Sequence, residues 1–193
     1  MPKSTINFSI ADNPTKLAGL KQDWQRLFEE YNNNNYFLNF DWNWFSWKYI
    51  AEPCGYSLRI IVGYSQKRVV LVWPLVLSTL PGVHILRWLG SQAGDFQDVL
   101  VEHSEYSGRW LEQAWEFVQE SPADLVFLHG VRPGSNIETI KAINVDKGEL
   151  QIAPYIDWQQ WSNWTQYCAG WKPKFRSSWF RRTLGYFICC VCK

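Results

Sequence analysis

The first part of the chain combines one strand pattern with two helical patterns. Residues 6–10 alternate apolar and polar side chains and predict a short strand. Asn13 followed by Pro14 is typical of a helix start, with Asn13 as the N-cap. Apolar side chains then recur at helical spacing and predict one amphipathic helix, along Leu17, Leu20, Trp24, Leu27, Phe28 and Tyr31. A loop over 32–35 precedes a second, very aromatic helix over 40–51.

From residue 57 the period changes to that of strands. Runs rich in Val, Ile and Leu, divided by Gln66-Lys67 and by Pro81-Gly82, predict consecutive antiparallel strands. The predicted strands cover 58–64, 68–80, 83–89 and 96–101. Mixed patterns follow, with helices over 107–120 and 135–145, strands over 125–128 (fully apolar) and 150–158, and helical residues from 160 to 185. This order predicts an α+β fold whose sheet is mostly antiparallel at its start and parallel near its end.

The composition is that of a folded protein rich in aromatic residues. Of the 193 residues, 47% are hydrophobic and 19% are charged, which excludes an intrinsically disordered chain. The net charge of +1 gives no overall field toward nucleic acid or an anionic membrane, so any such binding requires a local patch. The 13 Trp residues form either a Trp-rich core or stacking surfaces for sugars or bases.

The sequence indicates no membrane span, export signal or metal cluster. The longest apolar run, 69–77, is shorter than the ~18 residues that cross a bilayer. Residues 1–16 lack the apolar segment of a signal peptide, so we expect a cytoplasmic protein. The odd count of five Cys argues against a disulfide framework. Cys189-Cys190-x-Cys192 lacks zinc-knuckle spacing, so no metal site is expected.

Few side chains point to catalysis. Gly90-Ser91 lacks the second glycine of a nucleophile elbow. The three His residues lie far apart, which favours structural roles over a metal site or a catalytic triad. Asp95 and Asp98 follow Gly94, and they either cap a turn or bind substrate.

Two loops partly match phosphate-binding turns. Residues 87–92 begin like the R-x-x-G-x-G/A loop of CoA-dependent acetyltransferases but depart from it at Gln92. Residues 132–136 lie between a predicted strand and a predicted helix, so their backbone N–H groups could meet an anion. An ordinary turn capped by Ser135 or Asn136 is the alternative for this second loop.

A basic segment with interleaved aromatic residues covers 172–182. Its charges are those of Lys172, Lys174, Arg176, Arg181 and Arg182. Phe175 and Trp179 share one helical face. The segment is either a groove wall for a phosphorylated ligand such as CoA, or for nucleic acid, or it is a solvated amphipathic helix.

A succession of short motifs covers residues 17–184. It comprises Trp24-x-x-Leu27, Phe40-Asp41-Trp42 with Trp44 and Trp47, Trp73-Pro74-Leu75, Leu86-Arg87-Trp88-Leu89-Gly90, Asp95-Phe96-Gln97-Asp98, Ala153-Pro154-Tyr155-Ile156-Asp157, and Lys174-x-Arg176 before Arg181-Arg182-x-Leu184. In this order the chain resembles the N-terminal half of the CelD/BcsL family of GNAT-superfamily acyltransferases, whose members are linked to the biosynthesis of cellulose and other polysaccharides.

The resemblance implies a GNAT-like lobe, a mixed and mostly antiparallel sheet with flanking helices. It also implies acyl transfer from acetyl-CoA or another acyl-CoA to a sugar or amino-acid-like acceptor. The acceptor-side candidates are Trp73, Asp95 and Asp98, and the basic wall comprises Arg176, Arg181 and Arg182. No catalytic base is assigned.

The family is built of two such lobes, and the second usually carries the acyl-CoA site. The resemblance therefore divides this chain into an N-terminal lobe over 1–158, a helical segment over 159–185 leading towards a second lobe, and an atypical Cys-rich tail over 186–193. We expect a truncated or frame-shifted reading, without its cofactor site.

Two other functions stay open. The first is a non-catalytic carbohydrate-binding module that uses exposed Trp platforms. Its candidate platforms are Trp42, Trp44, Trp47, Trp161 and Trp164, which would be core residues if they are shielded. The second is nucleic-acid binding through 172–182, although the preferred hypothesis includes no nucleic-acid partner.

Overall fold

The computed structural model describes residues 5–31, 35–141 and 158–172. The chain divides into two compact units, Met1–Val145 and Asp146–Lys193. The domain boundaries predicted at 158 and 185 fall beside or within the stretches outside the described residues, so they stay predictions.

The N-terminal elements follow the predicted pattern with one change. They are β1 (Asn7–Ala11), α1 (Pro14–Gly19) and α2 (Lys21–Tyr31). The Asn13 side chain accepts a hydrogen bond from the backbone N–H of Lys16 at 2.9 Å, which confirms the predicted N-cap. The single predicted helix is two helices, because the backbone N–H of Leu20 turns back to the carbonyl of Leu17. The apolar stripe is nevertheless buried along Leu17, Leu20, Trp24 and Leu27.

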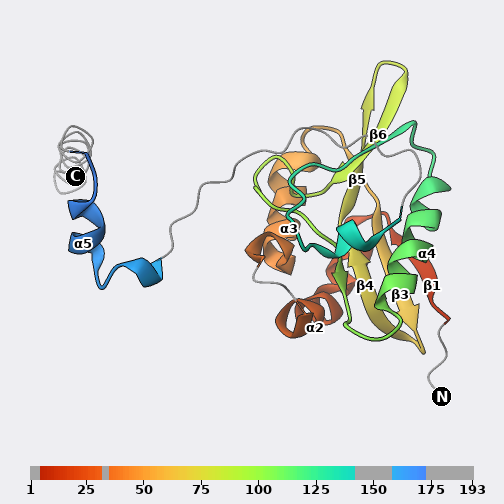
Figure 1. The fold of residues 1–193 in the computed structure, drawn as a ribbon. Helices are drawn as coiled ribbons and strands as arrows, with labels where there is room; N and C mark the ends of the chain where they lie inside the picture. Colours follow the sequence, from red (N-terminus) through yellow and green to blue (C-terminus); the bar gives the residue numbers. More distant parts are fainter. Residues whose placement is uncertain (1–4, 32–34, 142–157, 173–193) are drawn as a thin grey trace. The chain divides into compact units, whose positions relative to one another are not determined.

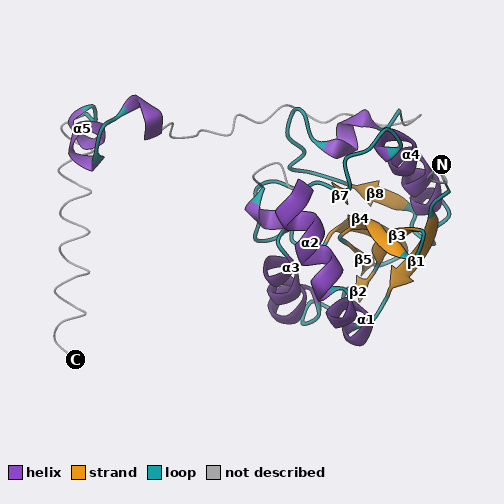
Figure 2. Ribbon diagram, turned by 90° about the horizontal axis from the view of Figure 1, so that it is seen from below, coloured by secondary structure: helices purple, strands orange, loops and turns teal. Residues whose placement is uncertain are grey.

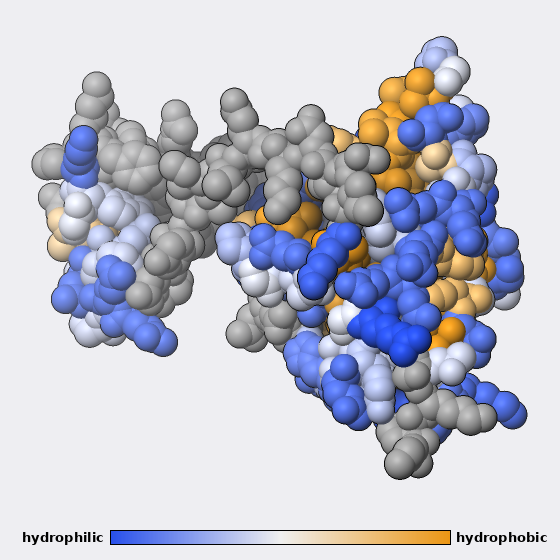
Figure 3. Space-filling view, turned by 45° about the vertical axis from the view of Figure 1, so that its right-hand side comes forward, coloured by the Kyte–Doolittle hydropathy of each residue, from blue (hydrophilic) through white to orange (hydrophobic). Residues whose placement is uncertain are grey.

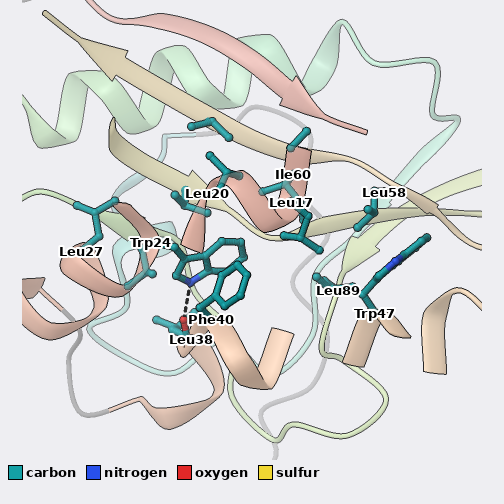
Figure 4. Packing of buried hydrophobic residues seen from close by; sticks show 14 of the residues in the cluster. Leu17, Leu20, Trp24, Leu27, Leu38, Phe40, Trp47, Leu58, Ile60 and Leu89 are labelled. Carbon is teal, nitrogen blue, oxygen red and sulfur yellow. Dashed lines mark hydrogen bonds between the residues drawn. The ribbon is translucent and has the colours of Figure 1, made fainter. Parts of the chain in front are cut away.

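The second predicted helix begins where expected but changes its winding. A short 3₁₀ turn, η1 (Tyr36–Leu38), leads into α3 (Phe40–Ser46), which continues as the π-helical turn η2 (Trp47–Ala51). Asn39 caps α3 by accepting from the N–H of Asp41 at 2.8 Å. Phe40 and Trp47 are buried, so these aromatic residues form core, as Figure 4 shows.

The strands form two four-stranded sheets. They are β2 (Ser57–Leu58), β3 (Ile60–Ser65), β4 (Arg68–Trp73), β5 (Leu75–Leu80), β6 (Val83–Trp88), β7 (Leu100–Val101) and β8 (Leu125–Phe127). The first sheet has the order β1-β3-β4-β7 and is antiparallel throughout. The second has the order β2-β5-β6-β8, and only its β6–β8 pair is parallel. The predicted α+β class is confirmed, but the strands form two sheets instead of the one that was predicted, because the chain changes sheets at Pro74.

Turn residues determine how the strands connect. Gln66 and Lys67 have φ values of 51° and 69°, as a two-residue hairpin loop with the twist of its strands requires. Pro74 divides the predicted strand 68–80 into β4 and β5. Trp73 therefore pairs with Ile61 in the first sheet, whereas Leu75 pairs with Trp88 in the second.

Two apolar cores lie on opposite faces of the strands. Val62, Val72 and Leu100 point to the core formed with α1–α3, where the indole Nε1 of Trp24 donates to the carbonyl of Leu38 at 2.8 Å (Figure 4). Their neighbours Ile61 and Leu71 point to the second core. This core includes the buried stripe Trp110, Leu111, Ala114 and Val118 of α4 (Ser107–Gln119). Figure 2 shows the strands between α4 on one side and α1–α3 on the other.

Three predictions in the middle of the chain need correction. The strand over 96–101 is reduced to β7, because residues 90–97 make turns and a loop instead of a ladder. The apolar strand over 125–128 is β8, but its Leu125 and Phe127 are exposed because β8 lies at a sheet edge. The helix over 135–145 is only the 3₁₀ turn η3 (Asn136–Thr139) up to residue 141.

The described part of the second unit is short. It comprises the 3₁₀ turn η4 (Trp158–Gln160) and α5 (Trp164–Ala169), where Asn163 caps α5 by accepting from the N–H of Gln166 at 2.9 Å. Cys168 is buried. The strand predicted over 150–158 and the basic segment beyond 172 lie outside the described residues, apart from Trp158 and Lys172 themselves.

Candidate functional site

The parallel strands β6 and β8 end beside each other, and their following loops meet. Pairing ends at Arg87 and Phe127. Beyond these residues lie the loops 89–99 and 128–136, here called the carboxyl-end loops. They are joined where the backbone N–H of Gln97 donates to the carbonyl of Gly130 at 3.0 Å. Ligands of α/β proteins bind preferentially beyond the carboxyl ends of parallel strands, so the carboxyl-end loops are the expected location of a site.

Three buried polar atoms from two distant segments lie around Gly90. A Cβ atom on Gly90 would lie 3.2 Å from Trp42 Nε1 and 3.6 Å from Gln97 Nε2. Gln97 is 1% exposed, and neither its two amide atoms nor Trp42 Nε1 has a hydrogen-bond partner. Buried polar groups are normally paired with protein, water or ligand. Because these buried atoms lack partners, this Gly90 cluster (Gly90, Trp42 and Gln97) is the candidate site in the described part of the chain.

Aromatic rings enclose the Gly90 cluster. The Phe37 ring meets Trp42 edge-on with centroids 5.1 Å apart, and Tyr36 meets it at 6.0 Å. Phe96 lies 6.3 Å from Phe37 and carries the Arg132 guanidinium 5.0 Å above its ring. Few polar groups among aromatic walls are typical of sites for small organic molecules.

Asp98 fastens the carboxyl-end loops together. Its carboxylate accepts from the backbone N–H groups of Val99 at 2.8 Å, Asn136 at 2.8 Å and Ile137 at 3.0 Å. Burial raises the pKa of Asp98, although these three donors oppose that shift. Both carboxylate oxygens accept hydrogen bonds from the backbone. Of the two predicted roles, turn capping and substrate binding, these contacts are those of a turn cap.

The other predicted site residues do not come together. Trp73 is fully buried in the second core, 6.1 Å from Trp88 and 6.3 Å from Trp115 between ring centroids, so it presents no surface to an acceptor here. Asp95 is exposed on the carboxyl-end loops, and its role as a substrate contact stays a prediction. Arg176, Arg181 and Arg182 lie outside the described residues.

In the second loop with phosphate-binding features, 132–136, and in the residue that follows it, backbone amides are already engaged. The N–H of Gly134 donates to the Glu138 carboxylate at 2.7 Å, and the N–H groups of Asn136 and Ile137 donate to Asp98. The protein's own carboxylates thus hold these amides. Arg87 stands on β6, with its guanidinium 5.7 Å above the ring of Tyr56.

The sequence did not single out the Gly90 cluster as one site. In the sequence analysis Gln97 belongs only to the motif Asp95-Phe96-Gln97-Asp98. Trp42 is part of the aromatic helix and a candidate platform for carbohydrate. No periodicity indicates that these two side chains meet at Gly90, because the contact depends on how α3 packs against the carboxyl-end loops. The available signal was weaker: two glycines, Gly90 and Gly94, shortly before a polar residue that leads into an apolar strand.

The Trp platforms differ in exposure. Trp47 is buried, and Trp42, Trp44 and Trp161 are half-buried. Trp164 is 45% exposed and belongs to a group of rings around α5. In that group Tyr167 lies 4.9 Å from Trp161, 5.3 Å from Trp164 and 5.2 Å from Trp171, between ring centroids.

Within the described ranges, no three His, Cys, Asp or Glu side chains are grouped so that they could hold a metal ion. No helix in the same ranges is long and apolar enough to cross a membrane. Comparisons with protein-family models, with curated proteins and with solved structures each give no match to this chain.

Proposed function

We propose that this chain is the acceptor-binding lobe of a GNAT-type, acyl-CoA-dependent acyltransferase. The observation that carries the proposal is the Gly90 cluster, because it places unpaired hydrogen-bonding atoms beyond the carboxyl ends of β6 and β8. The acceptor is a sugar or an amino-acid-like molecule, and the resemblance adds a role in polysaccharide or cell-envelope biosynthesis.

The order of elements supports this proposal. A strand and helices precede consecutive antiparallel strands, and α4 then connects these strands to the parallel strand β8. The resemblance implies one mixed, mostly antiparallel sheet with flanking helices; this chain has mostly antiparallel pairing and flanking helices, but its strands form two sheets. The α+β class alone would fit many functions, so the proposal rests on the site as well as on the topology.

The Gly90 cluster binds and orients the acceptor in this proposal. Gln97 Oε1 accepts a hydrogen bond from an amine or hydroxyl group, and Gln97 Nε2 and Trp42 Nε1 donate to its oxygens. The rings of Tyr36 and Phe37 cover the apolar side of the acceptor. Acyl-CoA would supply a thioester: the acceptor's amine or hydroxyl would form the new bond to its carbonyl carbon, the C–S bond would break, and CoA would leave as the thiol with the proton that the acceptor loses. Holding the acceptor in one orientation lowers the entropic cost of that attack.

Calorimetry with candidate acceptors tests the proposal. The wild-type protein is titrated with glucosamine, N-acetylglucosamine and amino acids. Gln97→Leu and Trp42→Phe should each weaken acceptor binding about tenfold, because each leaves a polar group of the acceptor unpaired.

Gln92→Leu is the matched control, since Gln92 stands on the same loop but is exposed. It should bind acceptor as the wild type does. Absence of acceptor binding, for every acceptor tested, contradicts the proposed function. If Gln97→Leu and Gln92→Leu weaken acceptor binding equally, the acceptor does not bind at the Gly90 cluster.

Carbohydrate binding without catalysis is the second candidate function, and the aromatic group around α5 favours it. Trp164 is exposed beside Tyr167 and Trp171, and such rings stack on sugars. Trp164→Ala should then reduce retention on an insoluble polysaccharide, whereas Trp42→Phe should not. The reverse result favours the Gly90 cluster.

A further inference from the structure

Strand β1 forms an open edge of the first sheet. In the order β1-β3-β4-β7 it is paired on one side, through five consecutive residue pairs with β3. Figure 1 shows β1 at the outer side of this sheet. Alternate residues of an edge strand point their N–H and C=O groups away from the sheet. Within the described ranges no backbone hydrogen bond reaches these outward groups of β1, so a further extended strand would satisfy them.

The edge formed by β1 lacks the features by which edge strands avoid pairing with another chain. These features are short length, charged side chains, proline and bulges. The other sheet edges, β2, β7 and β8, are two or three residues long. In contrast, β1 has five residues in unbroken register with β3, and residues 5–11 contain no ionisable side chain and no proline. Of the edges in the described part of the chain, β1 is therefore the one suited to pairing.

We propose that β1 pairs with β1 of a second copy of this chain, antiparallel and about a two-fold axis that passes through Ser9 perpendicular to the sheet. A two-fold contact brings the same strand together with itself, and antiparallel pairing continues the order of the first sheet. The axis at Ser9 gives the register that pairs all five residues, so Asn7 faces Ala11 of the second copy. Two four-stranded sheets then join into one of eight strands, a usual size for a sheet.

The apolar side chains of β1 are complementary in this register. Phe8 and Ile10 lie on the face of β1 toward α4, where the Phe8 ring stacks on Phe117 with ring centroids 5.3 Å apart. Both side chains are only half-buried. Each Phe8 faces Ile10 of the second copy, and pairs of aromatic and β-branched residues across antiparallel strands stabilise a sheet. Because β1 carries no charge, no pair of like charges opposes the contact.

The opposite face of β1 has room for side chains of the added strand. A hollow of about 210 Å³ lies beside Ser9 and Ala11, with Lys16 and Gly19 of α1 on its other side. Asn7 of the second copy faces Ala11 and points to this face of the sheet, because residues 7, 9 and 11 share one face of a strand. Its side chain therefore enters the hollow without displacing α1.

Sedimentation velocity of the full chain at increasing concentration tests this pairing. A strand pair of this length is a small contact, so we expect a weak dimer whose population rises with concentration. Ser9→Lys should weaken dimerisation about tenfold, because two like charges then face each other at the axis. An equimolar mixture of Ser9→Lys and Ser9→Glu should restore the dimer, because opposite charges then meet at the axis.

The matched control is Ser57→Lys, the same substitution at an exposed serine of the edge strand β2. It should dimerise as the wild type does. Ser9 is exposed as well, so both lysine variants should keep the circular dichroism spectrum of the wild type. If Ser9→Lys fails to fold, Asn7→Lys, at another exposed position of β1, replaces it.

A wild-type chain that stays monomeric at every concentration overturns the proposal, and so does equal dissociation by Ser9→Lys and Ser57→Lys. Failure of the mixed Ser9 variants to dimerise overturns the axis at Ser9. The alternative surface for self-association is the β5–β6 hairpin, along which Figure 3 shows hydrophobic residues and where Leu80 is 52% exposed. A dimer that Leu80→Asp dissociates and Ser9→Lys does not belongs to the hairpin and contradicts the pairing of β1.

Discussion

The Asp98 carboxylate holds three backbone amides from two segments that are distant in sequence. The spacing of Asp95 and Asp98 predicted either turn capping or substrate binding, and the structure assigns capping to Asp98. Sequence alone could not make this choice. The partner amides of Asn136 and Ile137 are brought near Asp98 only by the packing of η3 beside β7.

Asp98→Asn should destabilise the protein by about 1–3 kcal/mol, because one carboxylate oxygen becomes an NH₂ group facing backbone donors. Urea unfolding followed by circular dichroism measures this change. Asp95→Asn on the same loop is the control, and we expect it to change stability by less than ~0.5 kcal/mol because Asp95 is exposed. Equal effects would contradict the anchoring role of Asp98.

The carboxyls of Asp98 and Asp124 should titrate in opposite directions from the ordinary Asp value. Burial raises the pKa of Asp98, whereas hydrogen bonds from the backbone and the ring of His84 lower the pKa of Asp124. Between its ordinary and folded pKa, Asp98 holds more proton in the folded chain, so its contribution to stability falls as pH rises. The contribution of Asp124 is lost as pH falls through its folded pKa. Carbon-detected NMR titration of both carboxyls measures these directions.

Of the two glycines in the second carboxyl-end loop, Gly130 should tolerate replacement by alanine less well than Gly134. Gly130 and Gly134 have φ values of +70° and +79°. A Cβ on Gly130 would lie 2.5 Å from the backbone oxygen of Asp95, whereas one on Gly134 meets nothing within 4 Å. Gly134→Ala should cost about 1 kcal/mol from backbone strain alone. Gly130→Ala should cost more and shift the Asp95 segment, which thermal unfolding and amide chemical shifts detect.

At the scale of elements, prediction succeeded where a local pattern decides the structure. The Asn13 cap, the helix α4 and the Gln66-Lys67 turn all follow from nearby residues. It failed where packing decides. The strand predicted over 96–101 is only β7, because its first residues belong to the carboxyl-end loops. The apolar run over 125–128 did not reveal that its strand lies at a sheet edge, where Leu125 and Phe127 are exposed.

The Gln66-Lys67 turn offers a stabilising substitution. Both residues have positive φ. This left-handed region costs free energy for L residues, less for Asn and Asp, whereas glycine adopts it freely. Lys67→Gly should stabilise the protein by roughly 0.5–1 kcal/mol, since removing the strain exceeds the entropy that glycine adds to the unfolded chain. The melting temperature should rise. Lys48→Gly in the helical turn η2 should lower it and serves as the contrasting variant.

For the whole molecule, both apolar cores belong to the first unit. Their buried members range from Ile6 to Val118, and they pack against opposite faces of the same strands. Residues 1–145 should therefore fold without the rest of the chain, with one cooperative thermal transition. Circular dichroism and proteolysis of this fragment measure that outcome. A fragment that lacks a cooperative transition would show that the second unit is needed for folding.

Pro74 separates the β3–β4 hairpin from the β5–β6 hairpin, so the strand pairing of each is independent of the other. A strand that slips by one residue against its neighbour moves every side chain to the opposite face. In this chain β4 pairs before Pro74 and β5 pairs after it, each with its own partners. A misaligned β5–β6 ladder would leave the alignment of β3 with β4 intact, so errors of register arising at the exposed hairpin stay confined there.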